Sequence, residues 1–217
     1  MKKRAFCLLT ALICLLCAPA MAAGGASFFR SVQYGPMVSY ENYVYGYSIS
    51  VYDRFAPLDD EYLASLLQSM DESAAASGED SDEIYDLRIW LSPDSRYEFH
   101  VMVKEPTYDS FETEVSMAPQ YGDLVRDSYP ADSNLRMLHE GILRETAAGT
   151  MLETAVAYDQ TEDGYTYTTI FMYYDLYSGG AEYCFSLYAY DGDYEAAQAM
   201  LAEICDTVTI APQGYVV

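Results

Sequence analysis

The chain has 217 residues, of which 34 are Asp or Glu and 11 are Lys or Arg, so its formal net charge at pH 7 is −23. A negative field of this size repels nucleic-acid phosphates and anionic lipid headgroups, which argues against both as partners. Hydrophobic residues make up 51% of the chain, as expected for a folded protein, and 23 of its residues are tyrosine. The acidity indicates solubility outside the cell, with a cationic partner or calcium as the alternatives.

Residues 1–22 have the pattern of a secretory signal peptide. Lys2-Lys3-Arg4 is basic, residues 5–18 are apolar, and Ala20-Met21-Ala22 supplies small residues before a cleavage point. We therefore expect a secreted protein that is cleaved near Ala22. Lipoprotein anchoring at Cys17 is disfavoured because the residue before it, Leu16, is bulky.

The rest of the chain is long enough for one domain with a sizeable core. We expect a linker over residues 23–42, a single α+β domain over 43–211 and a tail over 212–217. Without residues 1–22, which hold three basic residues and no acidic one, the formal charge becomes −26.

The first part of the domain predicts a half-buried strand over 43–53 and then a helix over 59–70. Asp59 is the expected N-cap, and the helix carries one apolar stripe, made by Tyr62, Leu63, Leu66, Leu67 and Met70. The following segment, residues 71–83, is acidic and predicts an exposed loop. Its carboxylates are a conceivable calcium site, formed by Glu79, Asp80, Asp82 and Glu83, but they lack the spacing of an EF-hand.

Residues 85–91 and 97–103 predict a hairpin around a Ser-Pro-Asp-Ser turn. If Leu91 pairs with Tyr97, four polar or aromatic side chains share one face of the hairpin. This candidate binding patch consists of Arg88, Trp90, Glu98 and His100. The alternative is a cross-strand packing cluster.

The segment from 106 to 150 is broken by Pro119 and Pro130. It predicts a short helix within 120–128. Residues 133–141 fit a short helix followed by a hairpin from Gly141, which we favour, or a strand that pairs across 147–149 with Met151.

The C-terminal third predicts an antiparallel meander. Residues 151–159, 165–177 and 182–191 are rich in β-branched and aromatic residues, and Gly-containing turns separate them. The middle run is apolar on both faces, so we expect helices on both sides of a twisted antiparallel sheet, an α/β/α sandwich. A helix over 193–206, capped by Asp193, and a last strand over 207–210 follow.

Two cysteines remain after the signal peptide, Cys184 and Cys205. In an exported protein they are candidates for a disulfide, and the alternative is two separate buried thiols. Neither lies near a histidine in the sequence, so we expect no metal site there.

No motif of a known catalytic chemistry is present. The two histidines, His100 and His139, show no zinc-binding spacing, and there is no Gly-x-Ser-x-Gly elbow or phosphate-binding glycine loop. With 34 acidic residues, paired carboxylates arise by chance, so a hydrolase is the weakest hypothesis. We therefore expect a protein that is not an enzyme and has no cofactor.

The order of elements resembles the PsbP-like superfamily from about Tyr45 to Ile210. The resemblance depends on the first strand, Tyr45–Val51, on the aromatic meander, and on the ending Ile204-Cys205-Asp206-Thr207-Val208. The superfamily includes an extrinsic protein of photosystem II, a yeast Ran-binding protein and secreted bacterial proteins. It implies an exported, non-catalytic accessory module that docks to an unknown partner.

A second hypothesis is a protein that binds a small ligand or carbohydrate through surface tyrosines, because tyrosine rings combine stacking area with a hydroxyl group. An exposed row of Tyr165, Tyr167 and Tyr173 would favour it. A cleft holding two carboxylates with raised pKa values would favour the hydrolase instead.

Overall fold

The computed structural model describes residues 33–77, 83–126, 129–130, 133–162, 164–190 and 192–211. Their elements in chain order are β1 (Met37–Asn42), β2 (Tyr47–Tyr52), β3 (Ala56–Pro57), α3 (Asp60–Ser77), β4 (Ile84–Leu91), β5 (Tyr97–Lys104), α4 (Phe111–Met117), the short 3-10 helix η1 (Ala118–Gln120), α5 (Tyr121–Arg126), β6 (Arg136–Thr146), β7 (Gly149–Glu162), β8 (Tyr165–Ser178), β9 (Ala181–Ala189), α6 (Tyr194–Cys205) and β10 (Thr209–Ile210).

The strands form two sheets, and every strand pairing among the described residues is antiparallel. The large sheet has the order β3-β4-β5-β9-β8-β7-β6, and the small one has the order β1-β2-β10. The predicted C-terminal meander is confirmed, since β8 pairs with both β7 and β9 and Met172 lies between Ala155 and Leu187.

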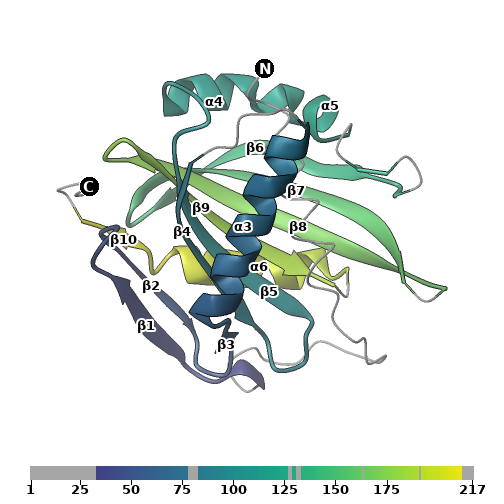
Figure 1. Ribbon diagram of the computed structural model, residues 1–217, viewed down its shortest axis with the longest axis horizontal. Helices are drawn as coiled ribbons and strands as arrows, with labels where there is room; N and C mark the ends of the chain where they lie inside the picture. The colour runs from purple at the N-terminus through teal and green to yellow at the C-terminus, as the bar shows by residue number, and fades with distance from the viewer. Residues whose placement is uncertain are drawn as a thin grey trace.

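Helices cover both faces of the large sheet, which confirms the predicted α+β sandwich (Figure 1). On one face, α6 and strand β2 of the small sheet enclose the main core, which includes Ile49, Phe99, Phe185 and Leu201. On the other face, α3 packs on β4, while α4, η1 and α5 lie over the β6 end of the sheet. Strand β8 is buried from Thr169 to Leu176, as its two apolar faces predict.

Helix α6 follows the predicted pattern. Asp193 caps it by accepting a hydrogen bond from the backbone N–H of Ala196 at 3.0 Å. The residues at helical spacing are completely buried on the sheet, and they are Ala197, Met200, Leu201, Ile204 and Cys205. The expected final strand is present as β10, which pairs with β2.

Helix α3 begins where predicted but ends later. Asp59 accepts a hydrogen bond from the Tyr62 N–H at 2.8 Å, and Leu63, Leu66 and Met70 are buried against β4. The helix continues to Ser77, although a loop was expected from residue 71. Three of the seven residues of this extension are alanine, the best helix former.

The structure differs from the expectations, or adds to them, in three further segments. Residues 37–42, expected to be linker, form strand β1, and the strand expected over 43–53 is shorter. Residues 111–117 form the helix α4, which was not predicted. The segment 136–146 is strand β6 rather than a helix, and Arg144 pairs with Met151 as in the alternative interpretation.

Gly141 explains why the sequence pattern of residues 136–146 did not predict strand β6. The β6–β7 register shifts on either side of His139, so apolar residues are not spaced two apart. Gly141 has φ +68°, and a Cβ at this position would collide with the Cβ of Ala118. The bulge therefore needs glycine both for its backbone angle and for its contact with η1.

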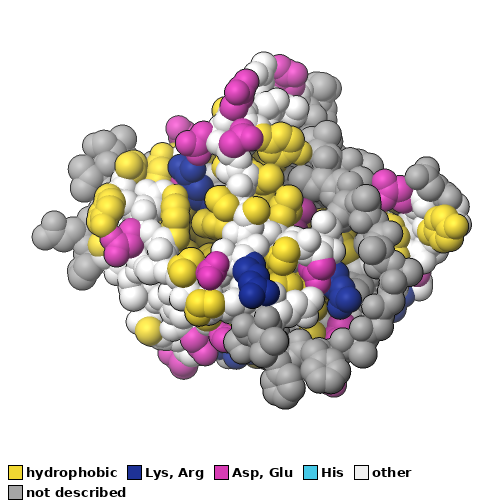
Figure 2. Space-filling view, turned by 90° about the horizontal axis from the view of Figure 1, so that it is seen from below, with side chains coloured by type: hydrophobic (Ala, Val, Ile, Leu, Met, Phe, Trp, Pro, Cys, Tyr) yellow, Lys and Arg dark blue, Asp and Glu magenta, His cyan; other side chains and the backbone are white. Residues whose placement is uncertain are grey.

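Some expectations fall outside the described residues. These are the signal peptide (1–22), most of the linker, most of the acidic calcium candidate (78–82) and the tail (212–217). None of the described helices has the length and apolar character needed to cross a membrane. On the face shown in Figure 2, acidic side chains are spread among apolar ones and basic groups are few.

Candidate functional site

The predicted patch of Arg88, Trp90, Glu98 and His100 is divided between the two faces of the sheet. The β4–β5 register differs from the prediction by one residue, since Leu91 pairs with Glu98 and Trp90 with Phe99. A shift of one residue turns side chains to the opposite face. Arg88 and Trp90 therefore lie on one face, and Glu98 and His100 lie on the other.

Both residues on the first face are engaged by other residues of the protein. Trp90 is buried, and its ring centroid lies 5.7 Å from that of Phe99. Arg88 forms an ion pair with Asp60 at 2.6 Å.

On the opposite face, His100 Nε2 lies 2.5 Å from Glu98 Oε1, and the Tyr190 hydroxyl donates to Glu98 Oε2 at 2.8 Å. Both Glu98 and His100 are buried. The packing alternative therefore describes these residues better than a surface patch does.

Cys184 and Cys205 are separate buried thiols, so the structure follows the second of the two alternatives. Cys205 belongs to the core between α6 and the sheet. Cys184 lies on β9 and faces the other side, where its thiol donates to Glu182 Oε1 at 3.2 Å. The sheet separates the two sulfur atoms, which explains why they are not bonded.

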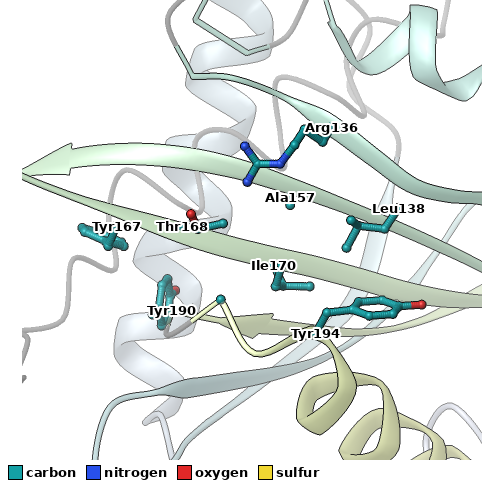
Figure 3. A pocket seen from close by; sticks show the side chains of 9 residues that line it. Arg136, Leu138, Ala157, Tyr167, Thr168, Ile170, Tyr190 and Tyr194 are labelled. Atoms are coloured by element: carbon teal, nitrogen blue, oxygen red, sulfur yellow. The ribbon is translucent and has the colours of Figure 1, made fainter. Parts of the chain in front are cut away.

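A groove of about 550 Å³ lies where β6, β7 and β8 meet the connection between β9 and α6. We call it the tyrosine groove (Figure 3). Its apolar part consists of Leu138 from β6, Ala157 from β7 and Ile170 from β8. Ala157 and Ile170 are buried at the edge of the main core, so this part of the groove is rigidly supported.

Three tyrosine rings line the same groove. Tyr167 comes from β8, Tyr190 follows β9, and Tyr194 is the first residue of α6. At Gly192 the β9–α6 connection lies close to β8. Gly192 has φ +71°, and a Cβ added there would lie only 3.3 Å from the carbonyl oxygen of Thr168. A side chain at position 192 would push the Tyr190 and Tyr194 walls away from the sheet.

The polar part of the groove is held by Asp159. This carboxylate accepts hydrogen bonds from Asn134 at 3.0 Å and from the Thr168 hydroxyl at 2.8 Å, and it lies 3.4 Å from Arg136. These hydrogen bonds, first that from Asn134, lower the pKa of Asp159. Arg136 and Thr168 both line the groove, and their contacts with Asp159 fix the positions of the guanidinium group and of the hydroxyl oxygen.

His139 contacts the hydroxyl group of Tyr194. The Tyr194 hydroxyl lies 2.9 Å from His139 Nδ1, and His139 Nε2 lies 3.0 Å from Glu153 Oε1. In Figure 3 the Tyr194 hydroxyl points away from Arg136 and Thr168, which leaves the ring to line the groove.

Glu153 is the fixed centre of this network. It is fully buried, and it accepts hydrogen bonds from Gln198 at 2.9 Å and from Arg144 at 2.8 and 3.0 Å. Burial alone would raise the pKa of Glu153, but hydrogen bonds from neighbours that include His139, Gln198 and Arg144 lower it to about 2. The residue therefore stays ionised at neutral pH, with one of its oxygens 3.0 Å from His139 Nε2.

Sequence reasoning found only part of this groove. Tyr167 belonged to the proposed row of exposed tyrosines, but Tyr173 is buried and only Tyr165 is largely exposed, at 79%. Tyr190 and Tyr194 were not singled out, although they flank the Asp-Gly break that ends the meander. His139 was dismissed as a zinc ligand, and its packing role depends on the unpredicted strand β6.

The criterion set for a hydrolase is not met by the tyrosine groove. Burial raises the pKa values of Glu114 and Asp175, yet both carboxylates lie in the interior near α4 and do not line the groove. The groove residues are rings, apolar side chains, one guanidinium and one threonine hydroxyl.

No protein-family model matches the chain, and no curated protein matches it. Among solved structures it is similar to cyanobacterial PsbP (CyanoP) from Synechocystis sp. PCC 6803, with 10% identity and a TM-score of 0.51 over 89% of this chain and 100% of the other. It is also similar to the Saccharomyces cerevisiae Ran-binding protein Mog1p, with 12% identity and a TM-score of 0.46 over 81% and 95%. At this level of identity the likeness shows the fold alone.

Proposed function

We propose, from the PsbP-like fold of this chain and the tyrosine groove at one end of its sheet, that it is an exported, non-catalytic binding module. The observation that carries the proposal is the groove itself, in which an apolar floor, three tyrosine rings and an oriented guanidinium converge. Export is supported by the sequence of residues 1–22 and the strongly acidic composition.

The chemistry of the groove favours a neutral, hydroxylated ring such as a sugar. Tyr167 and Tyr194 supply partly exposed rings for stacking, while Tyr190 is 3% exposed and stacks on Tyr188. Arg136 supplies hydrogen-bond donors, and the Thr168 oxygen, whose proton goes to Asp159, supplies an acceptor. Asp159 offsets the charge of Arg136, so the groove does not select strongly for an anion. Because His139 fixes Tyr194 before any ligand arrives, little side-chain entropy is lost on binding.

The test is titration of the purified protein with a panel of soluble mono- and oligosaccharides, followed by calorimetry. Tyr167→Ala should weaken any binding about tenfold, since it removes one stacking surface. Tyr165→Ala is the matched control, because Tyr165 lies on the same strand, is 79% exposed and does not line the groove. Equal losses in both variants, or no saccharide binding at all, would reject this ligand class.

A protein partner is the second candidate, and the edge strand β6 favours it. Among the described strands β6 pairs only with β7, and its side chains Ile142 and Leu143 are 47% and 54% exposed. An apolar strand edge of this kind is a common docking site for another chain. A partner cross-linked to the wild type but lost with Ile142→Lys, and retained with Tyr167→Ala, would assign binding to this edge.

A further inference from the structure

A buried charge cluster beneath α4 plays no part in the tyrosine groove. Lys104 at the end of β5 is 0% exposed, and Glu182 on β9 and Asp175 on β8 are each 1% exposed. Lys104 lies directly opposite Glu182 in the β5–β9 register, and Asp175 lies opposite Cys184 in the β8–β9 register. Lysine is almost never fully buried without a specific partner, so this arrangement calls for a chemical explanation.

The two oxygens of Glu182 have different surroundings. Oε1 lies 3.1 Å from Lys104 Nζ and 3.2 Å from the Cys184 sulfur. Oε2 accepts hydrogen bonds from the Thr107 backbone N–H at 2.6 Å and from the Tyr177 hydroxyl at 3.1 Å. Lys104 also donates to the Thr107 hydroxyl.

Asp175 lies beside this pair and has an unused oxygen. One of its carboxylate oxygens lies within 4.8 Å of a Glu182 oxygen and of the Cys184 sulfur. Its Oδ1 is buried without a hydrogen-bond partner among the described residues. Burial first, and then the charges of Glu114 and Glu182, hold the pKa of Asp175 well above its usual range, which favours the protonated carboxyl.

We propose that Lys104 and Glu182 become joined by an intramolecular amide bond, with Asp175 as the residue that transfers the proton. A buried ion pair is costly because both charges lose their hydration, whereas an amide is neutral. All three residues are buried, so water does not compete for the Lys104 amine or for the Glu182 carboxylate.

The reaction balances without an external reagent. The Lys104 ammonium passes one proton to Glu182 Oε1, and the neutral amine then attacks the Glu182 carboxyl carbon. The new C–N bond forms, and Asp175 takes a proton from the nitrogen while giving its own to Oε1. The C–Oε1 bond breaks and one water molecule leaves, so that Asp175 ends protonated as it began.

The existing hydrogen bonds suit both the reaction and its product. Negative charge on Oε2 during the attack faces the Thr107 N–H and the Tyr177 hydroxyl, which is the arrangement of an oxyanion hole. In the product, Oε2 is the amide carbonyl oxygen and keeps both donors. The remaining N–H of Lys104 keeps the Thr107 hydroxyl as its acceptor.

A metal ion is the competing explanation, because Asp175, Glu182 and Cys184 offer ligand atoms within 4.8 Å of one another. The ammonium group of Lys104 argues against it. Nζ already lies against Oε1, the oxygen that also contacts Cys184, so an ion at this point would meet a positive charge.

The experiment is an intact-mass measurement of the purified, denatured and reduced protein. The wild type should be lighter than its sequence mass by one water molecule, and protease digestion should yield one fragment that contains both Lys104 and Glu182. A full-mass wild type, or a full-mass protein that binds one divalent ion in native mass spectrometry, would overturn the proposal.

Variants locate the bond and identify the acid. Lys104→Met and Asp175→Asn should both have their full sequence mass, while Glu112→Gln, on the exposed side of α4, should still lose water. Circular dichroism verifies that each variant is folded. Loss of water in Lys104→Met would place the dehydration elsewhere and refute the bond, and its persistence in Asp175→Asn would refute the role of Asp175.

Discussion

Glu114 makes the stability of this protein depend on pH near neutrality. It lies on α4 and its side chain is 3% exposed. Its Oε1 accepts a hydrogen bond from the Tyr121 hydroxyl at 3.0 Å, and its Oε2 has no hydrogen-bond partner among the described residues. Burial first, and then the charge of Glu182, raise the pKa of Glu114 from 4.5 to about 7. Burial, the larger cause, acts whether or not Lys104 and Glu182 are covalently joined.

The direction of the effect follows from the raised pKa. The folded protein holds the Glu114 proton more tightly than the unfolded chain does, so this stabilisation is complete below pH 4.5. It is lost as the pH rises through about 7, and it stays lost at higher pH. A change from 4.5 to about 7 corresponds to about 3 kcal/mol in the free energy of unfolding.

Glu114→Gln removes the titration and keeps an oxygen for the Tyr121 hydroxyl. The free energy of unfolding of the wild type, relative to the variant, should therefore fall by about 3 kcal/mol between pH 4 and pH 8. Urea titrations followed by the fluorescence of Trp90, the single tryptophan of the chain, measure this at each pH. The amide nitrogen introduced by Glu114→Gln is buried, and it changes the free energy of unfolding by the same amount at every pH. This amount cancels, because only the change in that free energy with pH is compared.

Glu112→Gln is the control, because Glu112 lies two residues away on the same helix and is exposed. Its stability should follow that of the wild type at every pH. If Glu114→Gln also ran parallel to the wild type from pH 4 to pH 8, burial of Glu114 would not govern its ionisation, and the reasoning would fail.

Glu153, with its pKa lowered to about 2, should stabilise the fold above pH 4.5 and lose this effect as the pH falls towards 2. Glu153→Gln should therefore make the free energy of unfolding depend less on pH in acid, and should lower it by about 2 kcal/mol at pH 7. Gly141→Ala should destabilise by about 1–3 kcal/mol in thermal unfolding, more than Gly164→Ala, because both have positive φ but only Gly141 faces Ala118. Thiol labelling of the unfolded, unreduced protein should modify both Cys184 and Cys205, and a disulfide would leave both unlabelled.

Local sequence patterns predicted the C-terminal half well. The meander and α6 depend on short-range features, namely Gly-containing turns, aromatic strands, the Asp193 cap and an apolar stripe at helical spacing. The two apolar faces of β8 predicted that helices would cover both sides of the sheet, and they do. These features depend on residues that are neighbours in the sequence, so they can be predicted without knowing the fold.

Long-range packing decided the features that the sequence predicted wrongly. The bulge at Gly141, which fits against Ala118, turned a helix-like pattern into strand β6. A difference of one residue in the β4–β5 register separated Trp90 from His100. Neither choice is encoded locally, because each depends on which residues meet across the sheet.

By itself the sequence determined that this chain is an acidic α+β protein with a tyrosine-rich antiparallel meander closed by a helix. Only the tertiary structure brought Tyr167, Tyr190 and Tyr194 around one groove, and only it placed Lys104 against Glu182. The physical reason is that both sites join side chains from strands and connections far apart in the chain, whose meeting is set by strand order and register rather than by local preference.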